Sequence, residues 1–249
     1  MTRRTTADGD AAVPSEDTSA EEAPGDGSRA APGVAAVYDR IAAHFSKTRE
    51  YPWPEVESFL DEFRGDGSGA PAVDVALDVG CGNGRHSELL VDAAERVVGV
   101  DVSGGLLTEA RRRAADRGYA DRLELVRGDA AALPVGAGAA DLAVYVAALH
   151  HLRPRDARVD SLAELGRALA PDGRGLVSAW STEHDRFDRD DGFDTTVDWT
   201  LPGGDTEPRF YHVYDPAEFR ADLDAAGVRV VDEFVSSGNC YAVVAPGDR

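Results

Sequence analysis

The chain has 249 residues, of which 43% are apolar, enough to fill one α/β core but not two large ones. Its 46 acidic residues outnumber its 26 basic ones, and the formal net charge is -20. No apolar run approaches the roughly 18 residues of a membrane helix, and the N-terminus lacks the apolar region of a secretory signal, so we predict a cytoplasmic protein.

The acidic balance comes mostly from aspartate, whereas the basic residues are arginines with the single exception of Lys47. This composition resembles that of proteins from salt-in halophiles, whose acidic surfaces stay hydrated in concentrated salt, and it suggests a halophilic archaeal source. In molar salt the attraction between basic groups and phosphate is weak for any protein. The net charge therefore does not exclude a nucleic-acid partner. We interpret Cys81 and Cys240 as free thiols.

Residues 1–33 are small, polar and acidic, with no aromatic residue, and we predict that they form a disordered tail. Apolar residues then recur at helical spacing on both sides of "HFSKTREYPW", so residues 34–66 are expected to form two helices that act as a lid. The arginine run "RRRAADR" at 111–117 is interpreted as the solvated face of a later helix.

Five apolar strands are predicted along the rest of the chain, and each except the last is followed by a possible helix. Buried strands that alternate with helices indicate a parallel sheet covered on both faces. An Asp-rich insertion at 181–214 and a closing antiparallel pair of strands follow. The pattern resembles the class I methyltransferase (Rossmann-like) fold: a seven-stranded, mostly parallel sheet with an antiparallel C-terminal hairpin, in one domain over 34–249. The predicted strands are 73–79, 96–100, 123–126, 142–148 and 175–180.

A glycine-rich turn, "LDVGCGNGRH", follows the first predicted strand. Glycines let a backbone approach a ligand closely, but dinucleotide enzymes share such a turn. Acids at three successive strand ends favour S-adenosylmethionine: one near its amine, one on the ribose hydroxyls and one near the adenine. The predicted cofactor-binding residues are Asp78, Gly80, Gly82, Gly84, Asp101, Asp129 and Ala130.

The fourth predicted strand ends in "AALHHL", which places His150 and His151 where doubly wound sheets bind their ligands. Adjacent side chains point in different directions, and which of the two faces the pocket is left open. No third ligand occurs at an informative spacing, so we predict no metal site.

Five stretches together resemble one family, the tRNA wobble-uridine carboxymethyl methyltransferases, which include the methyltransferase domain of an animal AlkB-type protein. The likeness covers residues 34–246. The stretches are "VYDRIAAHFSKTREYPWPEVESFL", "LDVGCGNGR", "AALHHL", "ELGRALAPDGRGLVSAW" and "RFYHVY".

The resemblance implies esterification of a 5-carboxymethyl group on a wobble uridine of tRNA. A carboxylate with a pKa of roughly 4 is already ionised, so no general base is needed, and an arginine could orient it. Arg49 and Arg209 are the predicted orienting residues and His150 completes the predicted catalytic set. The predicted substrate-binding residues, several with flat faces for an unstacked base, are Ser46, Trp53, His151, Tyr211 and His212.

The resemblance also implies a partner, a small zinc-binding activator protein that would form a heterodimer by extending the sheet along the strand 123–126. Two other functions stay open on the sequence. One is a small-molecule methyltransferase of the quinone type, in which His150 would be the base for carbon methylation. The other is a catalytically silent cofactor-binding scaffold.

Overall fold

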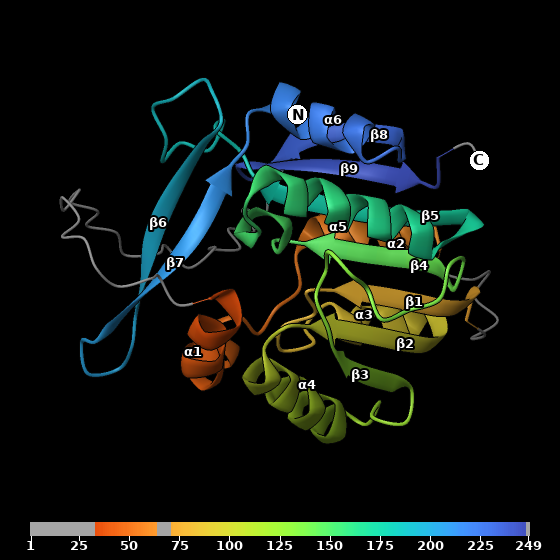
Figure 1. Ribbon diagram of the computed structural model, residues 1–249. Coiled ribbons are helices and arrows are strands. Elements are labelled where there is room, and N and C mark those ends of the chain that lie inside the picture. The colour runs from red at the N-terminus through yellow and green to blue at the C-terminus, as the bar shows by residue number, and fades with distance from the viewer. Residues whose placement is uncertain (1–32, 64–70, 248–249) are drawn as a thin grey trace, which may run out of the picture. The chain divides into compact units, whose positions relative to one another are not determined.

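The computed structural model describes residues 33–63 and 71–247 (Figure 1). The predicted tail, apart from Gly33, lies outside these ranges. None of the helices within them is long and apolar enough to cross a membrane.

Seven strands form one sheet in the order β3-β2-β1-β4-β5-β9-β8 (Figure 1). The first five in this order are parallel, β9 runs antiparallel to β5, and β8 runs antiparallel to β9. The predicted class I methyltransferase fold is thereby confirmed. The strands are β1 (Val73–Val79), β2 (Ala94–Asp101), β3 (Leu123–Arg127), β4 (Ala140–Val146), β5 (Leu169–Trp180), β8 (Arg229–Ser236) and β9 (Asn239–Ala245).

Helices cover both faces of this sheet, because its central strands are apolar on both sides. One buried cluster packs α5 and α6 against the sheet, and a second packs α2, α3 and α4 against it. The helices are α1 (Val34–Thr48), α2 (Pro54–Asp61), α3 (Ser87–Ala93), α4 (Gly104–Arg117), α5 (Arg155–Ala168) and α6 (Pro216–Ala225), with a short 3-10 helix η1 (Leu149–His151) after β4.

The connection between β3 and β4 differs from its prediction, because residues 128–139 contain no helix. Gly128, Gly136 and Gly138 punctuate this stretch, and Pro134 packs against Gly128. Glycine and proline both disfavour helix interiors, which explains the turns seen here.

The insertion contains a second, two-stranded sheet that the sequence reasoning did not foresee. Strands β6 (Phe193–Thr200) and β7 (Thr206–Val213) pair antiparallel, with Val197 opposite Arg209 and Trp199 opposite Glu207. Because side chains alternate along a strand, Trp199, Arg209 and Tyr211 share one face of this hairpin. That face packs on α1, where Trp199 joins a cluster with Tyr38, Ile41, Ala42 and Leu106.

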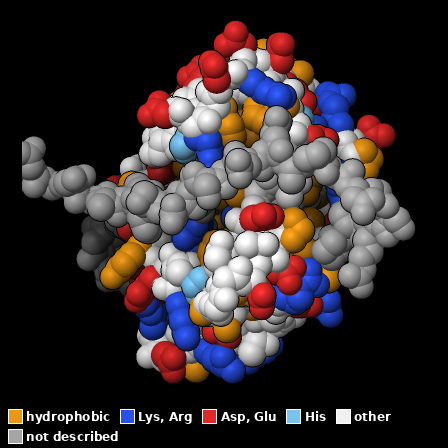
Figure 2. All heavy atoms as spheres, turned by 90° about the vertical axis from the view of Figure 1, so that its left-hand side faces the viewer, with side chains coloured by type: hydrophobic (Ala, Val, Ile, Leu, Met, Phe, Trp, Pro, Cys, Tyr) orange, Lys and Arg blue, Asp and Glu red, His pale blue; other side chains and the backbone are white. Residues whose placement is uncertain are grey.

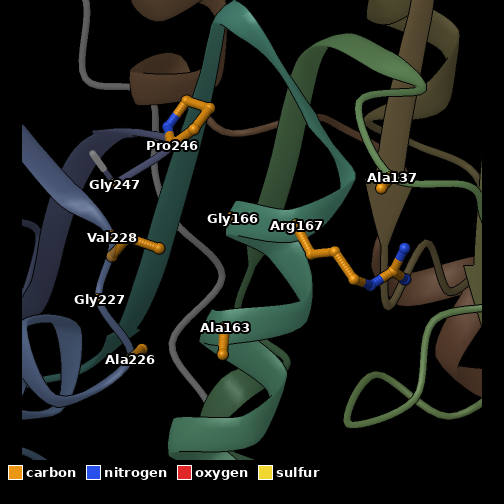
Figure 3. A pocket seen from close by; sticks show the side chains of 9 residues that line it. All are labelled: Ala137, Ala163, Gly166, Arg167, Ala226, Gly227, Val228, Pro246 and Gly247. Carbon is orange, nitrogen blue, oxygen red and sulfur yellow. The ribbon is translucent and has the colours of Figure 1, made fainter. Parts of the chain in front are cut away.

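A hollow lies near the amino ends of β4 and β5, at the opposite end of the parallel strands from the glycine turn. Figure 3 shows the side chains that line it. Most of its lining is small or aliphatic. Arg167, the charged residue in the lining, already pairs with Glu164 and donates to two backbone carbonyls. The hollow therefore offers little to a polar substrate. Its lining residues are Ala137, Ala163, Gly166, Arg167, Ala226, Gly227, Val228, Pro246 and Gly247.

Candidate active site

The glycine turn follows β1 and leads into α3. Gly80, Gly82 and Gly84 have φ angles of 68°, 54° and 76°, a region that side chains other than glycine rarely adopt. A Cβ on Gly80 would overlap the side chain of Ala148, at the end of β4. Glycine is therefore required at position 80 for both its backbone conformation and its packing.

Asp101 closes β2 beside this turn and is 8% exposed. One carboxylate oxygen accepts from the backbone N–H of Gly82 and the other from that of Ser103, both at 2.8 Å. Burial raises the pKa of Asp101 to about 6, although these two hydrogen bonds act to lower it. The carboxylate is held in one orientation and keeps lone pairs for two ligand hydroxyls.

Asp78 lies two residues before the first glycine of the turn and is 2% exposed. Its carboxylate accepts a 2.6 Å hydrogen bond from the Ser87 hydroxyl. Burial nevertheless raises its pKa to about 7. A cationic group would offset this unfavourable buried charge, so the residue fits the methionine amine of S-adenosylmethionine.

Asp129 and Ala130 follow the carboxyl end of β3, which ends at Arg127. Asp129 is exposed, and its carboxylate accepts from the backbone N–H of Ala131 at 2.9 Å. Ala130 is partly buried against the main core cluster. Carboxylates therefore stand at the ends of β1 and β2 and just beyond β3, in the arrangement predicted for an amine, a ribose and an adenine.

Helix α1 covers the cofactor turn. The Asn83 side-chain amide donates to the backbone oxygen of Arg49 at 2.9 Å and to the Ser46 hydroxyl at 3.4 Å. Asp39 accepts from the Ser103 hydroxyl and from the N–H of Gly105, at 2.7 and 2.8 Å. These contacts fix the end of α1, including Ser46 and Arg49, beside the glycine turn.

Arg49 and Arg209 converge on one aromatic ring, that of Trp199. Their guanidinium carbons lie 5.2 and 4.7 Å from the ring centroid. Arg209 also lies 5.2 Å from the Tyr211 ring, and Tyr211 stacks on Trp180 with 4.2 Å between centroids and 12° between planes. Both predicted arginines therefore lie beside the Trp199 ring. Of the three rings in this group, Tyr211 was predicted to bind the substrate, and Trp199 and Trp180 were not.

His151 is held at both ring nitrogens. Nδ1 faces the backbone oxygen of Phe210 and Nε2 faces the Tyr38 hydroxyl, each at 2.8 Å. The carbonyl can only accept, so Nδ1 carries the proton and Nε2 accepts from Tyr38. Burial lowers the pKa of His151 to about 3, so the ring is neutral and links α1 to β7.

His150 is 2% exposed and packs against both Trp180 and Tyr211. The backbone N–H of Trp180 donates to its Nδ1 at 3.1 Å, so the neutral ring carries its proton on Nε2. Burial also lowers the pKa of His150 far below its usual value. The ring is therefore neutral, and its acceptor nitrogen is already engaged.

Two predicted substrate-binding residues lie in other surroundings. Trp53 packs with His86, Tyr241 and Arg85 at the start of α2. His212 is on the face of β7 opposite Tyr211, and its two ring nitrogens contact Asp194 at 2.7 Å and Glu218 at 3.0 Å. The structure does not bring either residue to the Trp199 ring.

Sequence reasoning missed Trp199 and Trp180. The alternation of Phe193, Thr195, Val197 and Trp199 in "FDTTVDWT" could have indicated a strand with one apolar face, and so a buried tryptophan. The dominance of aspartate in the insertion concealed that signal. Within residues 33–63 and 71–247, no group of three or more His, Cys, Asp or Glu residues is arranged to hold a metal ion.

The sheet order, the glycine turn and its acids define a class I S-adenosylmethionine-dependent methyltransferase. A family model described as "Methyltransferase domain" matches residues 76–173. A protein of Encephalitozoon cuniculi named "Putative methyltransferase ECU09_1500" is 33% identical over 213 residues, which cover 83% of this chain and 92% of that protein. The chain belongs to the same methyltransferase family.

Other relatives carry more specific names. Mouse "tRNA (carboxymethyluridine(34)-5-O)-methyltransferase ALKBH8" is 34% identical over 149 residues, which are 60% of this chain but 20% of the mouse protein. The Saccharomyces cerevisiae protein named "tRNA (carboxymethyluridine(34)-5-O)-methyltransferase" is 33% identical over 177 residues, 70% of this chain and 58% of its own length. The matches thus span less than two thirds of these two relatives.

Solved structures share the fold at low sequence identity. The CcbJ methyltransferase of Streptomyces caelestis superposes with a TM-score of 0.65 at 20% identity, covering 85% of this chain and 98% of its own. A chain from the "Complex between the Haloferax volcanii Trm112 methyltransferase activator and the putative methyltransferase" superposes with a TM-score of 0.62 at 17% identity. The match covers 87% of this chain and 99% of that chain. At these identities the likeness concerns the fold.

Proposed function

We propose that this methyltransferase esterifies the carboxylate of a 5-carboxymethyl group on the wobble uridine of tRNA. The observation that carries the proposal is the convergence of Arg49 and Arg209 on Trp199, beside the glycine turn. Guanidinium groups recognise carboxylates through paired hydrogen bonds, and an aromatic face accommodates an unstacked base. The names of the mouse and yeast relatives support the same substrate.

The reaction requires the protein mainly to position the methyl donor and the acceptor. S-adenosylmethionine supplies a methyl group attached to a sulfonium. The acceptor carboxylate is ionised at neutral pH, so the residues of this chain have to orient it in line and exclude water. Arg49 and Arg209 would orient the carboxylate, and the apolar surface around Tyr38 and Trp199 would exclude water.

The state of His150 supports this reaction over carbon methylation. A base for carbon methylation needs an available lone pair, whereas Nδ1 of His150 is already an acceptor and Nε2 carries the proton. His151 is likewise engaged at both nitrogens. An acceptor that is already an anion needs no such base.

Access to the site requires α1 to move. Trp199, Arg209 and Tyr211 are 7%, 5% and 4% exposed, and α1 is among the elements that cover them. We therefore infer that residues 34–49 form a lid that opens for the substrate and closes over it, as enzymes that exclude water commonly do.

A small zinc-binding activator protein is proposed as partner. Strand β3 is an edge of the seven-stranded sheet, and an edge strand can pair with a strand of another chain. The structural likeness to a chain from the Haloferax volcanii activator complex supports this choice. In the proposed heterodimer, the activator pairs along residues 123–127.

The test is a methylation assay with the purified chain, with and without the activator, on labelled S-adenosylmethionine and tRNA from a strain lacking this protein. Nucleoside mass spectrometry should find the label in the methyl ester of 5-carboxymethyluridine. Label confined to small molecules, or on another base, would refute the proposal. Cofactor binding without any turnover would instead indicate a silent scaffold.

A further inference from the structure

The loop after β5 carries a group of half-buried rings. We call Trp180, His184, Phe187 and Phe193 the loop platform. Ring centroids of Phe187 lie 5.9 Å from Trp180, 5.8 Å from His184 and 5.4 Å from Phe193. Each of the four rings is partly exposed. Exposed apolar side chains that lie next to one another often mark a binding site.

Two arginines from the same loop lie over this platform. The guanidinium carbon of Arg186 is 5.4 Å from the Trp180 ring, and that of Arg189 is 4.5 Å from the Phe193 ring. Aromatic rings with arginines beside them form the usual binding surface for single-stranded nucleic acid, because every base can stack on a flat face. Figure 2 looks onto this side of the molecule and shows basic and hydrophobic side chains close together among acidic ones.

Backbone hydrogen bonds hold the loop in one shape. The N–H of Thr182 donates to the oxygen of Tyr214 at 2.8 Å, and the N–H of Phe187 donates to the oxygen of His184 at 2.9 Å. The N–H of Arg186 donates to Nδ1 of His184 at 3.1 Å. The platform is therefore formed before a ligand arrives, which lowers the entropic cost of binding.

The platform is continuous with the proposed methyl-transfer site through Trp180. That ring stacks on Tyr211, which lies beside Arg209. The steps from Trp199 through Arg209, Tyr211 and Trp180 to Phe187 measure 4.7, 5.2, 4.2 and 5.9 Å. A polynucleotide with one base at Trp199 would therefore reach Phe187 with a base a few positions along the strand, whereas a free nucleoside has no second base.

The charge of the loop decides how such a ligand would be held. Residues 181–192 contain four aspartates, one glutamate and two arginines, so the loop cannot attract phosphates by its net charge. Stacking has to supply most of the affinity. We propose that the loop platform binds a nucleotide a few positions from the methylated one in single-stranded RNA, an inference that rests on the proposed function.

The first experiment measures RNA binding by fluorescence anisotropy, with a labelled anticodon stem-loop and the whole chain. Phe187→Leu keeps the side chain apolar but removes the stacking face, and should weaken binding about tenfold. Phe187→Tyr keeps the ring and should bind as the unchanged protein does. Equal affinity of the Leu and Tyr variants would overturn the proposal, as would a stem-loop that does not bind at all.

The salt dependence separates stacking from phosphate contact. Phe187→Leu should leave the slope of log affinity against log salt unchanged, whereas Arg189→Gln should make it shallower by about 0.7, for one lost phosphate contact. Arg220→Gln is the matched control, because Arg220 is a surface arginine on α6 that pairs with Asp224 and Glu233. A Phe187→Leu variant that changes only the slope would refute a stacking role.

Methylation of free 5-carboxymethyluridine distinguishes the two proposals. Phe187→Leu should raise the KM for the stem-loop and leave the rate on the nucleoside unchanged. If neither the stem-loop nor the nucleoside is methylated, but stem-loop binding still depends on the ring at position 187, the proposed function is refuted. The platform then remains a binding surface for single-stranded RNA. If the stem-loop and the nucleoside are both methylated and Phe187→Leu changes neither reaction, only the platform proposal is refuted.

Discussion

Arg49 and Arg209 lie over the same ring, with their guanidinium carbons 5.2 and 4.7 Å from the centroid of Trp199. Arg49 is the C-cap of α1, and Arg209 is in β7 of a separate hairpin. Both guanidinium groups keep their positive charge at neutral pH. The Trp199 ring therefore has a cation beside it from each of two separate elements of the chain.

Arg49→Ala should lower kcat for methylation by roughly 100-fold, the loss usual when one group that orients charge in the transition state is removed. Affinity for S-adenosylmethionine should change little, because the contact of residue 49 with Asn83 uses its backbone oxygen. Steady-state kinetics and calorimetry measure the two effects. Lys47→Ala, at an exposed position of the same helix, is the control and should be neutral. Unchanged turnover in Arg49→Ala would show that the Arg49 side chain does not take part in methyl transfer.

Trp199→Leu should lower kcat/KM by about tenfold or more, because the stacking face beside both arginines is lost. Trp199→Phe keeps an aromatic ring and should therefore retain most activity, although it loses the hydrogen bond from Nε1 to Nδ1 of His44. The comparison is made on the stem-loop substrate, with Tm measured for both variants. Equal losses in the two variants would assign Trp199 to lid packing alone.

The sheet and the positions of the candidate cofactor-binding residues could be predicted because they depend on local signals. Apolar strands, turn glycines and acids at strand ends each fall within a few residues of one another, and Asp78 and Asp101 lie where the pattern placed them. The substrate side could not be predicted in the same way. Trp199 reaches Arg49 only through the pairing of β6 with β7 and the packing of that hairpin on α1, which are long-range events.

Trp53 and His212 are both predicted substrate-binding residues, and their surroundings depend on the fold. The start of α2 places Trp53 beside Tyr241, and strand alternation puts His212 on the face of β7 opposite Tyr211. The salt-adapted surface and the cytoplasmic location stay predictions, since they concern the environment of the protein and not its internal contacts.

The arginine run at 111–117 was interpreted as a solvated face, which is wrong for Arg113, whose side chain is 9% exposed. Arg113 donates to Glu88 at 2.7 Å and to the backbone oxygen of Glu50 at 2.6 Å. Arg117 contacts both glutamates as well. These contacts fasten the connection between α1 and α2 to α3 and α4, next to Arg49.

Arg113→Ala should therefore lower kcat by about tenfold, through misplacement of Arg49, and lower the free energy of unfolding by about 1–3 kcal/mol. Arg112→Ala is the control, because the Arg112 side chain is 67% exposed and pairs with Glu109 on the same helix. That control should stay within about 0.5 kcal/mol. A loss of stability in Arg113→Ala with kcat unchanged would limit Arg113 to a structural role.

Gly80→Ala and Gly118→Ala separate backbone strain from steric overlap. Both glycines have positive φ, 68° and 78°, so both substitutions should cost about 1 kcal/mol of strain. A Cβ at Gly118 meets nothing within 4 Å, whereas one at Gly80 overlaps Ala148. Gly80→Ala should therefore be the more destabilising by denaturant unfolding, and it should also lose cofactor binding. Equal effects in the two variants would contradict the packing at Gly80.

Asp78→Asn should stabilise the cofactor-free protein while it abolishes cofactor binding. In the folded state burial raises the pKa of Asp78 from 3.8 to about 7, so the native state binds a proton that the unfolded state releases. The stability that this proton provides is complete below pH 4 and is lost as the pH rises through 7. A shift of this size corresponds to, at most, about 4 kcal/mol.

The Tm of the unchanged protein should thus fall relative to that of Asp78→Asn between pH 4 and 7, and the two curves should then run parallel. Asp74→Asn, at an exposed position of the same strand, should track the unchanged protein throughout. Because a cationic ligand favours the ionised carboxylate, the affinity of the unchanged protein for S-adenosylmethionine should rise with pH up to about 7 and fall again above about 8, where the ligand amine loses its proton. Tm curves that stay parallel from pH 4 to 7 would show that Asp78 is not a strained buried acid, and cofactor binding by Asp78→Asn would remove it from the amine site.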